Sequence, residues 1–132
     1  MYSAQLLDHF EHPRNAGDVA DPDAVAEIEN PACGDVLRLT LKLEGERIQD
    51  IRFKAKGCVP SIACASALTE LVQGKQISEA HSLRRDALIE ALGGLPQAST
   101  HAAQLALDAL SAALSSLASR KREAAIPSSS TK

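Results

Sequence analysis

The chain has 132 residues, a length that suits one domain with a modest hydrophobic core. Its 14 basic and 17 acidic residues give a net charge of −3, which argues against the basic face of a nucleic-acid-binding protein. Aromatic residues make up only 2%, which also argues against platforms for base stacking. No apolar run approaches the roughly 20 residues that cross a bilayer, and the N-terminus lacks the pattern of a secretory signal. These features predict a cytoplasmic protein that binds neither nucleic acid nor membrane.

The first half of the chain predicts one helix followed by strands. Ser3 is the expected N-cap of a helix over Ala4–Glu11. Alternating apolar and polar residues predict the strands, which are Val25–Asn30, Val36–Leu43 and a third around Ile51, Phe53 and Ala55. In the second strand Arg38, Thr40 and Lys42 share the face that we expect to be solvated. The leucines on its other face need helices packed against them.

Helices dominate the second half of the chain. The expected helices cover Ser61–Gln73, Ile77–His81, Arg85–Leu92 and Thr100–Ala118. Residues 1–118 therefore predict one α+β domain, a three-stranded antiparallel sheet with helices packed on one face. Residues 119–132 are polar and have no apolar period, so we expect a disordered tail.

Four residues whose side chains can bind metal lie near the ends of the expected helices and strands. They are Cys33, Asp35, Cys58 and His101. Thiolate, carboxylate and imidazole groups are ligands for zinc or iron, and Cys58 precedes a helix N-terminus, which favours the thiolate. Glycines at 34 and 57 leave room for a close backbone approach or an unusual φ. Spacing alone leaves two interpretations open: a metal or cluster site, or half-buried loop thiols with a turn-capping aspartate and a helix-end histidine.

The remaining cysteine and the early histidines favour structural roles. Cys64 lies on the apolar stripe of its helix, which is typical of a small buried side chain. His9 and His12 stand near the end of the first helix, where we expect surface residues. An odd number of cysteines without a secretory signal argues against a disulfide framework.

Several fragments then occur in a specific order along the chain. They are Leu7–Asn15 (LDHFEHPRN), Pro31–Val36 (PACGDV), Gly57-Cys58, Ile62-Ala63, Thr69-Glu70, Gly74-Lys75 and His101. Together they resemble the iron–sulfur cluster assembly scaffold family, which comprises the IscU proteins and the N-terminal domain of NifU. The resemblance covers about residues 2–118, and its DHxxxPRN and ACGD pieces are especially specific.

The resemblance implies a small domain that is not an enzyme. It implies assembly of a [2Fe–2S] cluster from iron and from sulfur supplied by a cysteine desulfurase, followed by transfer to apo iron–sulfur proteins. Cys33 and Cys58 match the first two ligand cysteines of the family. Asp35 matches its aspartate and His101 its histidine, so the implied ligands of iron, cluster or zinc are these four.

The chain departs from the family at two places. The third family cysteine follows the histidine, and Ala102 stands there, without a ligand atom. The chaperone-recognition sequence LPPVK reads LPQAS over Leu95–Ser99, which does not favour docking of the specialised Hsp70-type chaperone. Two cysteines per chain would suit a cluster shared by a homodimer. Two alternatives remain: a degenerate paralogue acting as an interaction or regulatory module, and a sulfur acceptor that carries a persulfide on Cys58.

Overall fold

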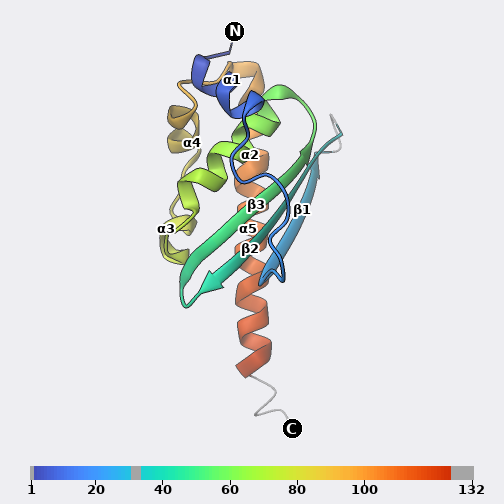
Figure 1. The fold of residues 1–132 in the computed structure, drawn as a ribbon, viewed down its shortest axis with the longest axis vertical. Coiled ribbons are helices and arrows are strands. Elements are labelled where there is room, and N and C mark those ends of the chain that lie inside the picture. The colour runs from blue at the N-terminus through green and yellow to red at the C-terminus, as the bar shows by residue number, and fades with distance from the viewer. Residues whose placement is uncertain (1, 31–33, 126–132) are drawn as a thin grey trace.

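A computed structural model describes residues 2–30 and 34–125, with side chains described as far as residue 117 (Figure 1). The elements in chain order are α1 (Ala4–Glu11), β1 (Ala24–Asn30), β2 (Asp35–Glu44), β3 (Arg47–Lys56), α2 (Val59–Val72), α3 (Ile77–His81), α4 (Arg85–Ala91), the 3-10 turn η1 (Gln97–Ser99) and α5 (Thr100–Ala125). The strands form one antiparallel sheet in the order β1-β2-β3. α5 packs against β1 and β2, while α2 packs against β3. The predicted α+β fold is confirmed.

The leucine face of β2 forms the centre of the core. Leu37, Leu39 and Leu41 are at most 2% exposed, and they pack among side chains of α2 and α5. The opposite face is less solvated than the alternation predicted, because Thr40 is completely buried. The backbone N–H of Val19 donates to Thr40 Oγ1 over 2.8 Å, so the segment between α1 and β1 crosses this face. Alternation identifies the two faces of a strand but cannot show which loop will cover the polar one.

α1 has the bounds and the cap that the sequence predicted. The Ser3 hydroxyl accepts a hydrogen bond from the Leu6 N–H over 3.0 Å, which satisfies one of the free donors of the first turn. Leu6 is fully buried, and α1 packs on α2.

α2 is the central helix of the domain, and most of its residues are buried. It contacts α1, α4, α5 and β3, which explains why it is apolar on nearly every side rather than along one stripe. It begins at Val59, two positions before the predicted start at Ser61, with Pro60 in its first turn.

α5 extends to Ala125, whereas the sequence placed its end near Ala118. The residues that follow Ala118 are good helix formers, and a helix already started can continue through them without an apolar period. The first residues of the expected tail are therefore helical in the structure. Residues 126–132 lie outside the described part. No described helix combines the length and apolar character needed to span a bilayer.

His9 is a correction to the sequence analysis, because its side chain is buried rather than on the surface. His9 Nδ1 lies 2.8 Å from Ser66 Oγ, and its Nε2 lies 3.6 Å from a Glu70 carboxylate oxygen. Burial lowers the pKa of His9, and the Arg14 guanidinium acts in the same direction against the opposing effect of Glu70. His9 thus holds α1 to α2 in its neutral form.

This burial predicts a pH-dependent stability. Histidine in an unfolded chain titrates at about pH 6.5. Just below that pH, His9 therefore binds more protons in the unfolded chain than in the folded one. We expect the free energy of unfolding to be highest above about pH 6.5 and to fall between about pH 7 and 5. The pKa values of Asp8 and Asp18 are held low by arginine hydrogen bonds, so these carboxyls titrate below this window. Urea unfolding of His9→Gln should show a flatter pH dependence, with His81→Gln as the control. An unchanged slope in His9→Gln would contradict this role.

Candidate metal centre

Three of the four predicted ligand residues come together at one end of the molecule. Asp35 is the first residue of β2, Cys58 is the N-cap of α2, and His101 lies in the first turn of α5. One ligand atom from each lies within 4.8 Å of the other two. Cys33, the fourth predicted ligand, lies outside the described residues. The ends of three elements that are distant in sequence therefore form one cluster of metal-ligating groups, which we call the Asp35–Cys58–His101 group.

Asp35 is the buried member of this group, with 5% of its surface exposed. Ser61 Oγ donates to Asp35 Oδ2 over 2.5 Å, and Cys58 Sγ lies 3.4 Å from the same oxygen. A buried carboxylate is costly unless donors surround it. These donors allow the Asp35 carboxyl group to remain inside the protein.

The backbone around Asp35 depends on two glycines. Gly34 has φ +77, a left-handed conformation that residues with a side chain rarely adopt, and its N–H closes the turn to Asn30 O over 2.7 Å. At Gly57 the reason is space, because a Cβ there would lie 2.5 Å from Asp35 Oδ1. The predicted unusual φ is thus confirmed at Gly34, and the predicted close approach at Gly57.

Cys58 is the exposed thiol of the group. It precedes the 14-residue helix α2 and forms no side-chain capping bond, so its sulfur lies at the N-terminal end of that helix. Lys54 Nζ lies 3.3 Å from an Asp18 carboxylate oxygen, so this lysine is paired with Asp18 rather than with Cys58.

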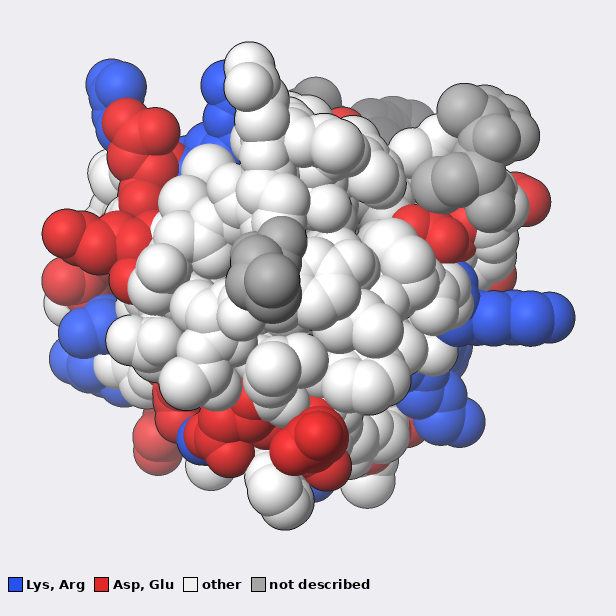
Figure 2. All heavy atoms as spheres, turned by 90° about the horizontal axis from the view of Figure 1, so that it is seen from above, with Lys and Arg blue, Asp and Glu red and all other residues white. Residues whose placement is uncertain are grey.

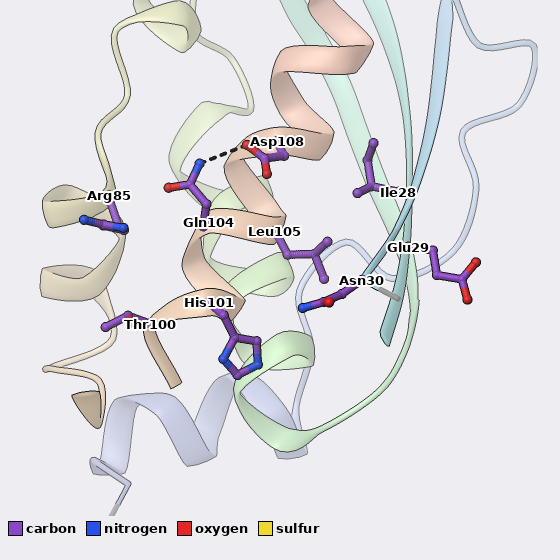
Figure 3. A pocket seen from close by; sticks show the side chains of 9 residues that line it. All are labelled: Ile28, Glu29, Asn30, Arg85, Thr100, His101, Gln104, Leu105 and Asp108. Atoms are coloured by element: carbon purple, nitrogen blue, oxygen red, sulfur yellow. Dashed lines mark hydrogen bonds between the residues drawn. The ribbon is translucent and has the colours of Figure 1, made fainter. Parts of the chain in front are cut away.

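His101 is exposed and lines a groove of about 490 Å³ between α5, α4 and the end of β1 (Figure 3). The groove walls also include Ile28, Asn30, Gln104 and Leu105. His101 therefore belongs both to the metal-ligating group and to an open groove beside it. Ala102, the next residue, is 1% exposed and packs in the core.

The donor set fits zinc or iron. Ligand atoms of one tetrahedral zinc are about 3.3–3.8 Å apart, given bond lengths of about 2.0–2.3 Å. The atoms of the Asp35–Cys58–His101 group lie within 4.8 Å of one another, so small side-chain movements would bring them onto one ion. Sulfur, imidazole and carboxylate ligands together suit borderline metals rather than magnesium or calcium.

Cys64 is a core residue, as the sequence predicted. It is completely buried, and burial raises the pKa of its thiol to about 12. A thiol reacts as its thiolate, so a brief iodoacetamide pulse near neutral pH should modify Cys58 and spare Cys64. Peptide mass mapping after the pulse checks this prediction, and unfolding in urea before the pulse should make both thiols reactive. Labelling of Cys64 in the folded protein would contradict it.

Sequence reasoning missed Ser61 as part of this centre. Its hydroxyl touches both Asp35 and Cys58, at 2.5 and 3.2 Å. The signal was present in the spacing, because residues three apart at the start of a helix lie on the same side. A hydroxyl three positions after a candidate ligand cysteine is therefore a useful indicator.

The end of the molecule that carries this group has few charges at its centre (Figure 2). Lys, Arg, Asp and Glu side chains gather around the rim of this face instead. Tyr2 and Leu7, at 37% and 39% exposure, are among the large apolar side chains exposed in the structure, and both belong to the α1 region at this end (Figure 1). Such a surface suits contact with another protein better than contact with a polyanion.

Comparison with known proteins agrees with this architecture. An iron–sulfur cluster assembly scaffold protein (IscU 1) of Archaeoglobus fulgidus is 46% identical over 114 residues, covering 86% of this chain and 74% of the relative. The IscU scaffold protein of Escherichia coli K12 is 41% identical over 127 residues, covering 93% and 98%. The crystal structure of a nitrogen-fixing NifU-like protein (N-terminal) from Brucella abortus superposes with a TM-score of 0.76 at 20% identity, covering 89% and 94%. The family model for the NifU-like N-terminal domain matches residues 1–124. The chain therefore belongs to the NifU-like N-terminal domain family.

Proposed function

We propose that this chain is an iron–sulfur cluster assembly scaffold that binds iron or a [2Fe–2S] cluster and passes it to apo-proteins. The observation that carries the proposal is the Asp35–Cys58–His101 group, whose ligand atoms lie within 4.8 Å of one another in a member of this family. The relatives named above as IscU scaffolds support the same role. The proposed scaffold domain is residues 1–118, followed by the polar residues 119–132, of which those up to Ala125 continue α5.

Four residues of each chain are proposed to hold the cargo: Cys33, Asp35, Cys58 and His101. Cys33 is included on the sequence resemblance, and the other three on their mutual distances as well. Two thiolates, an imidazole and a carboxylate suffice for one zinc ion, and a homodimer would supply four thiolates to one [2Fe–2S] cluster. These thiols must stay reduced to bind, which agrees with work in the cytoplasm.

Exchangeable ligation suits a protein that gives its cargo away. Cys58 and His101 are exposed, so an incoming thiol can reach the metal from their side. The sparsely charged face around this end is proposed to receive the cysteine desulfurase and the acceptor proteins (Figure 2). A scaffold of this kind holds and transfers a cluster without a catalytic residue.

Anaerobic reconstitution followed by transfer tests the proposal. The protein is incubated with ferric iron and sulfide, desalted, and mixed with an apo [2Fe–2S] ferredoxin as acceptor. Before mixing, we expect about two irons and two sulfides per chain or per dimer and a visible sulfide-to-iron absorption band. After mixing, the same band should appear on the ferredoxin. Uptake of zinc without iron or sulfide would indicate that the site is structural or regulatory. Uptake of no metal would refute the proposal and favour an interaction module.

A sulfur-acceptor role is a second candidate, favoured by the exposed position of Cys58 at a helix N-terminus. The Cys58 thiolate would attack the outer sulfur of a desulfurase persulfide, gaining that sulfur and releasing the desulfurase thiolate. Labelled sulfur on Cys58 after incubation with a cysteine desulfurase and labelled cysteine would support this role. Absence of label from every cysteine would exclude it.

A further inference from the structure

Ser61 lies between two members of the Asp35–Cys58–His101 group without belonging to it. Its side chain is buried, with 6% exposure for the residue. Ser61 Oγ is 2.5 Å from Asp35 Oδ2 and 3.2 Å from Cys58 Sγ. The hydroxyl is thus within hydrogen-bonding distance of both a carboxylate and a thiol of the metal-ligating group.

Hydrogen-bonding chemistry determines whether Asp35 or Cys58 accepts the hydroxyl proton of Ser61. A hydroxyl has one proton, and an ionised carboxylate accepts only, so the Ser61 proton is directed to Asp35 Oδ2. The lone pairs of the hydroxyl then face the Cys58 thiol. On its other side Asp35 lies against the Gly57 backbone, where even a methyl group would be 2.5 Å from Oδ1. The Asp35 carboxylate therefore lies between the Ser61 hydroxyl, which donates to it, and the Gly57 backbone, which leaves no room on the other side.

We propose that Ser61 is a positioning residue that holds Asp35 beside Cys58 in the orientation that receives the metal. This inference rests on the proposed function, and it adds a residue that none of the ligand assignments includes. Groups that orient a metal ligand commonly change metal affinity about 10–100-fold when they are removed. Ser61 acts through Asp35, and the metal is bound by the ligands themselves.

Zinc affinity, measured by competition with a chromophoric chelator, provides the first test. Ser61→Ala should weaken zinc binding about tenfold, because the carboxylate loses the donor that orients it. Ser61→Thr keeps the hydroxyl and should restore most of the affinity. Ser66→Ala is the matched control on the same helix: its hydroxyl contacts His9 and the Arg14 N–H, so this variant should lose stability but keep its zinc affinity.

A double-mutant cycle separates positioning from a general structural effect. If Ser61 acts through Asp35, then Ser61→Ala should change zinc affinity little in an Asp35→Ala background. An equal loss in both backgrounds would overturn the proposal and assign Ser61 a direct or purely structural role. Wild-type affinity in Ser61→Ala would overturn it too, while leaving the scaffold function intact. Failure of the wild-type protein to bind zinc or iron would instead refute the proposed function, and this inference with it.

Discussion

Cys58→Ser is expected to lose metal binding by more than about 100-fold, beyond the effect of removing a group that only supports a ligand. A serine hydroxyl does not ionise near neutral pH, so it cannot replace the thiolate beside Asp35 and His101. Cys58 is exposed just before α2, and a serine there keeps a hydroxyl that can still donate to Asp35. The loss should therefore appear in zinc and iron titrations while the unfolding transition stays close to that of the wild type.

Cys64→Ser is the matched control for this prediction, because it makes the same change inside α2, the helix that Cys58 precedes. Its site is fully buried in the core, where an unpaired hydroxyl costs about 1–3 kcal/mol. This variant should be less stable and still bind metal. On the sequence resemblance, Cys33→Ser should behave like Cys58→Ser. Loss of metal only in Cys64→Ser would refute the ligand assignment.

Gly57→Ala is the second substitution with a large expected effect. The new methyl group would lie 2.5 Å from Asp35 Oδ1 and 2.6 Å from its Cγ, distances that force the carboxylate to move. Crowding of this kind typically costs about 1–3 kcal/mol of stability. Because Ser61 anchors Asp35 on its other side, the displacement should also weaken metal binding. Urea unfolding and a zinc titration measure the two effects.

A double mutant tests whether the Asp35 carboxyl group is the group that the new methyl group of Gly57→Ala displaces. In an Asp35→Ala background the carboxyl group is gone, so most of the stability cost of Gly57→Ala should disappear. If the cost is the same in both backgrounds, the strain lies in the backbone of the loop between β3 and α2. The importance of Gly57 would then have nothing to do with the metal-ligating group.

Local sequence signals were sufficient for most of the architecture. The Ser3 cap, the alternation in β2 and the apolar positions of α1 each act within a few residues, so their pattern predicts the element directly. The burial of Thr40 and His9 could not be predicted in this way. Thr40 is covered by the segment that carries Val19, and His9 is held by Ser66 from another helix. Both contacts join residues that are distant in sequence.

For the candidate site too, the sequence indicated the individual residues but not the contacts between them. Position at element ends indicated Asp35, Cys58 and His101, but only the packing of β2, α2 and α5 shows that their ligand atoms meet within 4.8 Å. Spacing alone gave only a weak signal and no preference for a metal site over unrelated loop residues. The family resemblance supplied that preference, and the structure added Ser61, whose contacts join α2 to β2. Side-chain contacts across elements are the information that a linear pattern lacks.

X-ray absorption spectroscopy at the zinc edge of the zinc-loaded protein tests the central claim most directly. Binding by Cys33, Asp35, Cys58 and His101 predicts two sulfur neighbours at about 2.3 Å and two nitrogen or oxygen neighbours at about 2.0 Å. The outer-ring scattering of one imidazole should accompany them, and Cys58→Ser should remove one of the sulfurs. A shell made only of nitrogen and oxygen, or only of sulfur, would contradict the assignment of these residues as the metal centre.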